Sequence, residues 1–193
     1  FMPTSGSIIN FGQSLPIVAD KSYVSNTFRA STYKSIGEDV VGAGKLYIST
    51  INALNSDDVR LSKRKSLSTR RLRGFEKNKI GPKDGTDYIG GNYAAAINLE
   101  SNLPNLLPED TNTDITLFLD FGNVWGVDYD SSIDDSNKIR SSTGVAANWM
   151  SPVGPMSFVL SQNLLKADTD ETQSFNFQLG TTFWYETYKN FIL

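Results

Sequence analysis

The residues of this chain best suited to chemistry are one arginine and two carboxylates, Arg73, Glu100 and Asp120. A guanidinium offers a planar fork of N–H donors that matches a carboxylate, and the pair gains strength where water is excluded. Glu100 and Asp120 alone would also resemble the carboxylate pair of a glycosidase. Because a matching cation is available, we predict that the three residues form a structural ion pair and catalyse nothing.

The chain has 193 residues and contains neither His nor Cys. This excludes an imidazole base, a cysteine nucleophile, a thiolate zinc site and disulfides. We therefore expect no enzyme, no catalytic residue and no cofactor. Asp128, Asp130, Asp134 and Asp135 could gather a hard cation, but their spacing lacks the glycine-containing order of a calcium loop. An exposed acidic loop without a metal site is the prediction there.

A strongly basic segment runs from Arg60 to Lys79 and holds nine of the 18 Lys and Arg residues. Clustered cations suit nucleic acids, and residues 73–75 resemble the start of an RNA-recognition motif, which residues 76–79 then break. The whole chain has a net charge of −3 and a pI near 5.0, so we predict no nucleic-acid partner. A solvated charged loop is one alternative. A loop folded into a polar interior, with Arg73 held by carboxylates and Gly74 permitting a turn, explains more.

Apolar and polar residues alternate along much of the chain, which predicts about eight antiparallel β-strands. The pattern is clearest in the later part of the chain, and it puts Glu100 and Asp120 on the polar faces of two strands. The candidate strands are residues 5–17, 23–33, 40–50, 93–100, 115–122, 145–149, 156–160 and 175–183.

These strands could belong to a membrane barrel or to a soluble β-sandwich, since both alternate. No apolar run approaches the roughly 18 residues of a spanning helix, whereas a transmembrane strand needs only about 10 alternating residues. Trp125, Trp149 and Trp184 lie near strand ends, as in the aromatic girdles of barrels. These features favour the barrel.

Loop lengths support the same interpretation. Residues 37–39 and 151–155 form tight turns, while residues 52–90, 126–139 and 163–173 are longer and polar. Short turns at one end and long loops at the other are typical of outer-membrane barrels.

Six motifs, in this order, resemble the C-terminal half of the barrel in the BamA-type outer-membrane assembly factors of the bacterial surface antigen superfamily. The resemblance implies about eight strands of a 16-stranded antiparallel barrel, which alone would form an open, curved sheet. It implies a barrel segment at residues 1–183 with an inward-folded loop at residues 52–90, followed by an extension at residues 184–193. The motifs are at residues 72–75, 80–82, 90–92, 118–125, 149–155 and 175–183.

The resemblance also assigns roles to single residues. In that family an Arg-Gly-Phe loop enters the barrel lumen, and its arginine contacts acids of the inner wall. Arg73 matches that arginine, and Glu100 and Asp120 match the acids. The loop motif as a whole comprises Leu72, Arg73, Gly74 and Phe75. The last strand, which carries an assembly signal and borders a seam, matches Phe175, Phe177, Leu179, Gly180 and Phe183.

The function implied by the resemblance is the folding and insertion of other β-barrel proteins in the outer membrane of Gram-negative bacteria through a lateral seam. The implied partners are the lipid bilayer, unfolded client barrels and accessory assembly lipoproteins, with POTRA domains preceding the barrel. One alternative is a related barrel that secretes or translocates a polypeptide. Others are a soluble β-sandwich binding module that uses the basic loop, and a passive porin.

Overall fold

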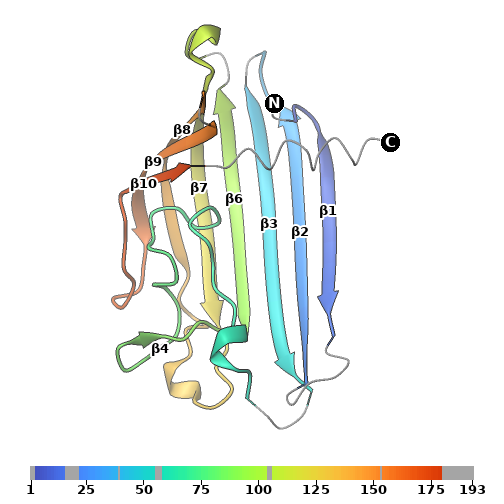
Figure 1. Cartoon of the computed structure of the whole chain (residues 1–193), viewed down its shortest axis with the longest axis vertical. Helices are drawn as coiled ribbons and strands as arrows, with labels where there is room; N and C mark the ends of the chain where they lie inside the picture. The colour runs from blue at the N-terminus through green and yellow to red at the C-terminus, as the bar shows by residue number, and fades with distance from the viewer. Residues whose placement is uncertain are drawn as a thin grey trace.

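A computed structural model of the chain describes residues 3–15, 22–38, 40–54, 58–103, 106–152 and 154–179. These residues form one antiparallel sheet of eight strands and a small two-stranded sheet (Figure 1). The strands of the large sheet are β1 (Gly6–Ser14), β2 (Tyr23–Ser35), β3 (Val41–Ala53), β6 (Tyr93–Leu103), β7 (Thr113–Trp125), β8 (Arg140–Ser151), β9 (Gly154–Leu165) and β10 (Phe175–Leu179). The small sheet is β4 (Lys83–Asp84) and β5 (Asp87–Tyr88).

Each strand of the large sheet pairs with the next one along the chain, in the order β1-β2-β3-β6-β7-β8-β9-β10. Three short 3-10 helices lie in the connections, at Leu61–Lys63, Glu109–Thr111 and Ser131–Ile133. Within the described ranges, no helix is long and apolar enough to cross a membrane.

The predicted open, curved sheet of eight strands is confirmed. The strand ends differ from the predicted ones: β2 and β3 extend to Ser35 and Ala53, and β1 covers only Gly6–Ser14. Backbone pairing continues past the last alternating side chain, so the side-chain pattern does not mark where a strand stops. The soluble β-sandwich is wrong, because all eight long strands lie in a single sheet.

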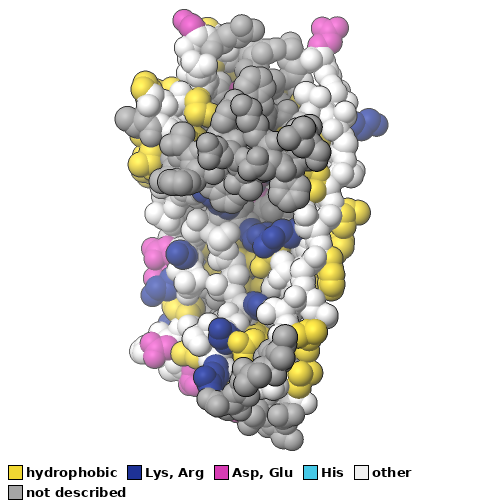
Figure 2. Space-filling model, turned by 45° about the vertical axis from the view of Figure 1, so that its right-hand side comes forward, with side chains coloured by type: hydrophobic (Ala, Val, Ile, Leu, Met, Phe, Trp, Pro, Cys, Tyr) yellow, Lys and Arg dark blue, Asp and Glu magenta, His cyan; other side chains and the backbone are white. Residues whose placement is uncertain are grey.

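The two faces of this sheet have inverted polarity compared with a soluble protein. Large hydrophobic side chains such as Ile97, Leu117 and Leu160 are exposed on the outer face, whereas Asn98 and Asp120 are buried on the inner one. In Figure 2 hydrophobic side chains follow the right-hand edge, while Lys and Arg gather in the middle and lower part of the visible face. An apolar exterior and a polar interior are what a membrane barrel requires.

The long connection between β3 and β6, residues 54–92, is here called the inner loop. Its described part lies against the concave face of the sheet (Figure 1). It packs there through one apolar core, made of the loop residues Leu67, Leu72, Phe75 and Ile80 and the wall residues Ala94, Ala96 and Val124. Gly122 makes room for this core, since a Cβ on it would lie 2.8 Å from a methyl carbon of Leu67.

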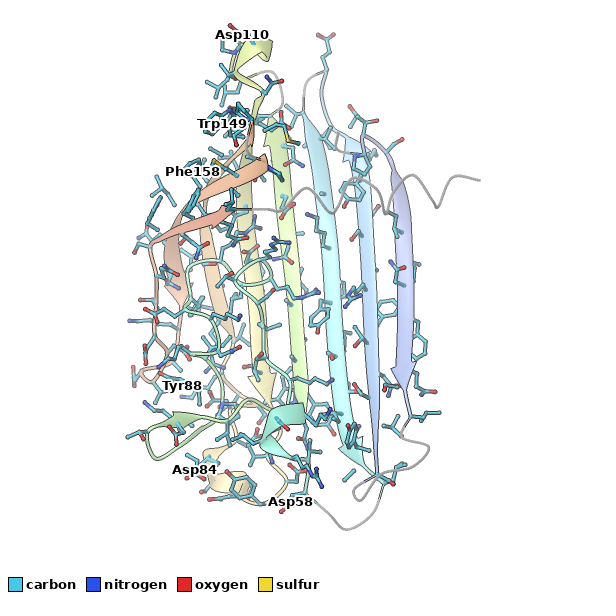
Figure 3. All side chains as sticks on the ribbon, viewed as in Figure 1. Asp58, Asp84, Tyr88, Asp110, Trp149 and Phe158 are labelled. Carbon is cyan, nitrogen blue, oxygen red and sulfur yellow. The ribbon has the colours of Figure 1, made fainter. Side chains whose placement is uncertain are left out.

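The two ends of the sheet differ as the loop lengths predict. Asp84 and Tyr88 lie at the end with the long connections, and Asp110 and Trp149 lie at the opposite end (Figure 3). Trp125 ends β7 at the long-loop end, where its ring stacks on Tyr93 with centroids 5.7 Å apart. Aromatic rings thus stand at both ends of the strands, as at the two interfaces of a bilayer. Trp184 lies outside the described residues.

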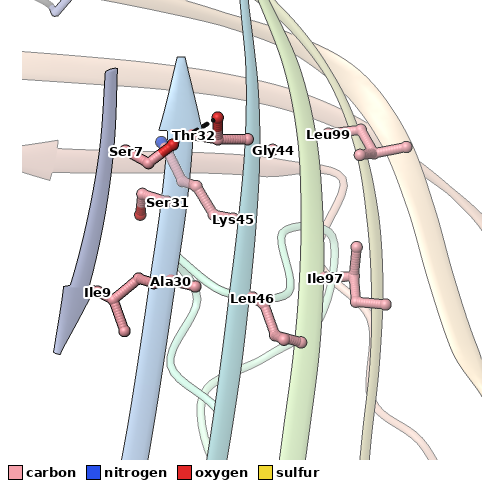
Figure 4. Close-up of a pocket in the computed structure, with 10 residues that line it drawn as sticks. All are labelled: Ser7, Ile9, Ala30, Ser31, Thr32, Gly44, Lys45, Leu46, Ile97 and Leu99. Carbon is pink, nitrogen blue, oxygen red and sulfur yellow. Dashed lines mark hydrogen bonds between the residues drawn. The ribbon is translucent and has the colours of Figure 1, made fainter. Parts of the chain in front are cut away.

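The outer face carries a shallow groove of about 350 Å³ over β1, β2, β3 and β6 (Figure 4). Its walls include Ile9, Leu46 and Leu99, and its floor includes Gly44. Ser7 donates a hydrogen bond of 3.0 Å to the Thr32 hydroxyl within it. Polar atoms on a lipid-facing surface need such internal partners because the bilayer core supplies none.

Candidate functional site

Arg73 and Asp120 form the centre of the candidate site. The Arg73 Nε and Nη2 atoms donate to the two oxygens of Asp120 at 2.7 and 2.6 Å, and the Arg73 backbone N–H donates to the same carboxylate at 3.1 Å. Asp120 is fully buried and the Arg73 side chain is 9 % exposed. This two-pronged geometry is the strongest form of ion pair that a guanidinium makes.

Glu100 and Lys45 complete the charge balance of this cluster. Arg73 Nη2 also donates to Glu100 at 2.9 Å, and the Lys45 ammonium donates to the other oxygen of Glu100. Two cations therefore meet two carboxylates, which leaves no net charge. We call Arg73, Lys45, Glu100 and Asp120 the Arg73 anchor. Its members come from the inner loop and from β3, β6 and β7. Arg73 is bonded directly to β6 and β7, and Glu100 links it to Lys45 of β3.

Neutral groups hold the anchor from the remaining sides. The Arg73 guanidinium carbon lies 3.8 Å from the centre of the Phe118 ring, and the Asn98 amide donates to Asp120 at 2.7 Å. The Ser142 hydroxyl donates to the Arg73 carbonyl. With both carboxylates of the anchor accepting hydrogen bonds and Arg73 paired through Nε and Nη2, the buried pair avoids the penalty that an unpaired charge would carry.

Gly74 has a backbone that only glycine adopts easily, with φ of +87°. A Cβ at this position would lie 3.2 Å from both the Ser142 Cβ and the Ser161 hydroxyl. The Gly74 carbonyl accepts from the Asn163 amide at 2.9 Å. The turn after Arg73 thus lets the loop backbone approach β8 and β9 closely, as proposed from the sequence.

The environment of Arg73 keeps it charged. Burial lowers the pKa of the Arg73 guanidinium, but the hydrogen bonds and charges of Asp120 and Glu100 outweigh it and raise that pKa. A guanidinium is already protonated at every physiological pH. The anchor is therefore a permanent ion pair and not a proton carrier.

A second buried cluster surrounds Arg140 at the start of β8. Arg140 is fully buried, donates to both oxygens of Asp170 at 2.8 to 3.2 Å, and also contacts Asp135 and the Asn123 side chain. Asp170 in turn accepts from the Ala167 N–H at 2.6 Å. The sequence analysis missed this cluster. The sequence did offer one indication. Arg140 is two residues before Ser142 on the same strand, so its side chain points to the same inner face, where a buried cation needs an acidic partner.

The four acids of residues 128–135 go to four separate partners. Asp128 accepts from Arg64, Asp134 accepts from the Gly126 N–H, and Asp135 pairs with Arg140. Asp130 accepts from the Ser132 N–H and so caps a short 3-10 helix. Within the described part of the chain, no group of three or more acidic residues is placed to hold a metal ion.

Several other basic residues of the inner loop also have partners within the chain. Arg71 lies over the Tyr47 ring at 3.4 Å, Lys65 donates to Ser25 at 2.7 Å, and Lys79 pairs with Glu171 at 3.1 Å. Much of the basic segment thus attaches the loop to the wall.

The predicted seam strand is β10 at the edge of the sheet. Phe175, Phe177 and Leu179 are exposed on its outer side, and the Phe177 ring lies 5.1 Å from that of Phe158 on β9. Within the described residues β10 pairs with β9 at five positions and has its other edge free. Gly180, Phe183 and the predicted extension at residues 184–193 lie outside the described residues.

Comparison with known proteins decides the family. The Omp85 superfamily domain matches residues 1–183 of the chain. The chain belongs to the Omp85 superfamily. It is an outer-membrane protein segment, as the resemblance implied.

Individual relatives of this Omp85 chain are BamA proteins. The chain is 35% identical over 139 residues to the outer membrane protein assembly factor BamA of Neisseria meningitidis serogroup B, which covers 58% of the chain and 17% of that protein. It is 26% identical over 193 residues to the assembly factor BamA of Neorickettsia risticii, covering 95% of the chain and 25% of the relative. The relatives are named as assembly factors, in agreement with the prediction of a non-enzymatic protein.

The fold of the Omp85 chain matches a solved structure. The crystal structure of BamA from Haemophilus ducreyi lacking POTRA domains 1–3 superposes with a TM-score of 0.82 at 27% identity, covering 92% of this chain and 38% of that one. The chain thus spans about a quarter or less of the length of the two BamA relatives above.

Proposed function

We propose that the protein containing this chain folds and inserts client β-barrel proteins into the outer membrane, with β10 forming one side of the seam at which a client strand pairs. The family and the BamA relatives support this assignment. Its partners would be the lipid bilayer, unfolded client barrels and accessory assembly lipoproteins.

The observation that carries the proposal is the position of β10 at the edge of the described sheet. Among the described residues β10 pairs with β9 on one side only, whereas β7 pairs with both β6 and β8. An edge strand leaves backbone N–H and C=O groups free to accept another strand. In the bilayer such groups have no water to bond, so pairing with a client strand is strongly favoured without nucleotide hydrolysis.

The Arg73 anchor would serve this function by keeping the barrel in shape while the seam changes. It fixes the inner loop to β6 and β7, several strands away from β10. Client strands would then pair at the β10 edge, while the anchored part of the sheet keeps its shape. The residues proposed for the seam are Phe175, Phe177, Leu179, Gly180 and Phe183.

The experiment uses a photo-reactive amino acid in the full-length protein, reconstituted with an unfolded client barrel. The probe replaces Phe177 on β10 or, as the control, Leu117 on β7, which is similarly exposed on the same outer face (47% and 45%). We expect client adducts from position 177 and none from position 117.

Equal client labelling from both positions would contradict seam pairing at β10. A related barrel that translocates polypeptides would instead be supported if the client is labelled from inward positions such as Tyr47 and is released across the membrane unfolded.

A further inference from the structure

We infer that the inner loop holds β10 in place through a small, partly exposed contact, made of Thr69, Arg70 and Gln178, and that this contact must break before the seam opens. The inference rests on the proposed function and assigns its regulation to named residues. We call these three residues the last-strand contact.

The contact engages both ends of one amide. Arg70 Nε donates to the Gln178 oxygen at 3.0 Å, and the Gln178 nitrogen donates to the Thr69 hydroxyl at 3.3 Å. Gln178 is on the inner side of β10, opposite the exposed Phe177 and Leu179. Within the described residues, Thr69 and Arg70 are the inner-loop residues that hydrogen-bond to β10 itself.

The segment that leads into β10 is held far more firmly. Phe75 of the inner loop forms a β-bridge with Thr172. Three backbone hydrogen bonds of 3.0 Å flank this bridge, from Glu76 N–H to the Glu171 carbonyl, from Glu171 N–H to the Lys79 carbonyl and from Gln173 N–H to the Gly74 carbonyl. The residue before this segment, Asp170, is fixed by the fully buried Arg140.

β10 therefore starts at a fixed point. Residues 171–173 are bound to the inner loop by backbone hydrogen bonds, while the described part of β10 is joined to that loop by side-chain hydrogen bonds of Gln178. An edge strand opens by local unfolding more often than the body of the sheet. Because the Arg70 bond is exposed and its acceptor is neutral, it adds modest stability and can be broken and remade.

The geometry also places the contact close to the Arg73 anchor in sequence. Thr69 and Arg70 precede Arg73 by four and three residues, in a turn closed by bonds from the Arg71 and Leu72 N–H groups to the Ser68 carbonyl. The anchor thus fixes the base of this turn, and the turn presents Arg70 to the last strand. A client strand that pairs with β10 would have to pull Gln178 away from that turn.

The test measures hydrogen exchange of the β10 amides in the full-length protein in bilayer nanodiscs, without any client. Arg70→Met and Gln178→Leu remove the contact while keeping most of each side chain's length. Lys77→Met is the matched control, because Lys77 is an exposed cation of the same loop for which the structure shows no partner among the described residues. We expect roughly three- to tenfold faster exchange across residues 175–179 in both variants, as the loss of ordinary hydrogen bonds implies.

Gln178→Glu is a variant for which we expect the opposite result, slower exchange of the β10 amides. A carboxylate would pair with the Arg70 cation and should slow exchange of the same amides despite losing the bond to Thr69. If Arg70→Met and Gln178→Leu both exchange like Lys77→Met, the contact does not hold the strand and the inference is overturned.

A second arm tests whether the contact must be released. Cysteines at positions 69 and 178, joined by a short linker with two thiol-reactive groups and an internal disulfide, should block client insertion. Reduction of that disulfide should restore it. Full insertion by the crosslinked protein would overturn the release step. If the unaltered protein inserts no client at all, the proposed function fails, while the exchange measurement still decides whether the contact exists.

Discussion

The Arg73 anchor and the last-strand contact are both made by arginines of one short stretch of the inner loop, yet they differ in almost every physical respect. Arg73 lies in a buried, charge-balanced cluster with a fully buried carboxylate. Arg70 makes a single exposed bond to a neutral amide. Breaking a buried ion pair is costly because it leaves a charge without water, whereas an exposed bond is replaced by water at little loss. The loop therefore has a permanent attachment and a releasable one within four residues.

The largest expected effect comes from Arg73→Ala. The substitution leaves Asp120 buried with an unpaired charge, and we expect the full-length protein to lose about 3–5 kcal/mol of unfolding free energy. Arg73→Lys should recover only part of this loss, because an ammonium cannot form the two-pronged pair. Denaturant unfolding in detergent measures both. A loss below about 1 kcal/mol for Arg73→Ala, the range of surface pairs, would place the anchor in the same class as the last-strand contact.

Arg140→Met should have the next largest effect, about 3 kcal/mol, because it strips the buried Asp170 of its partner. The effect should be local: exchange in residues 166–173 should rise while the Arg73 amide stays protected. Residue-resolved hydrogen exchange distinguishes local loosening of residues 166–173 from loosening that also reaches Arg73. Equal loosening at Arg73 and at Asp170 would show that the two clusters form one unit, against the division drawn here.

Gly74→Ala tests the turn that follows Arg73. The positive φ of Gly74 and the 3.2 Å approach of Ser142 and Ser161 to a new Cβ predict a loss of about 1–3 kcal/mol. Gly85→Ala is the control, since Gly85 also has a positive φ but nothing lies within 4 Å of its Cβ position. Comparing their unfolding free energies separates backbone strain from crowding. A crowded site predicts the larger loss for Gly74, and equal losses would contradict it.

The smallest expected effect is the pH response of Asp128, which lies between β7 and β8 and bonds Val59 and Arg64 of the inner loop. Burial raises the pKa of Asp128, but hydrogen bonds, led by that from the Val59 N–H, and the charge of Arg64 outweigh it and hold the pKa below its usual value. A lowered folded pKa stabilises the protein above the unfolded pKa and loses that effect as pH falls through the folded value. The protection factor of the Val59 amide should therefore fall below about pH 4 and stay level above it. Asp128→Asn should abolish the step.

Much of the sheet was predictable because alternation is strong where one face meets lipid. Residues such as Ile115, Leu117 and Leu119 on β7 fixed both the strand and the inward parity of Asp120. The same alternation predicted that Glu100 on β6 points inward, and the family resemblance identified Arg73 as its partner. These three residues meet in one cluster in the structure.

The contacts that were missed depend on the path of loops. Asp170 lies between β9 and β10, in a segment with no periodic pattern, so nothing in the sequence relates it to Arg140 thirty positions earlier. The β-bridge between Phe75 and Thr172 was missed for the same reason, because both residues lie in connections without a periodic pattern. Gln178 was visible as an inward polar residue, but its partners belong to a turn whose position follows from the Arg73 anchor.

The most direct test of the account is a double-mutant cycle between Arg73 and Asp120 in the full-length protein. Unfolding free energies are measured for Arg73→Met, Asp120→Leu and the double variant. If the two side chains form a desolvated pair that anchors the loop, the double variant should be more stable than either single one, since neither charge is left alone. Losses that simply add would show that the two residues do not depend on each other, and would contradict the anchor.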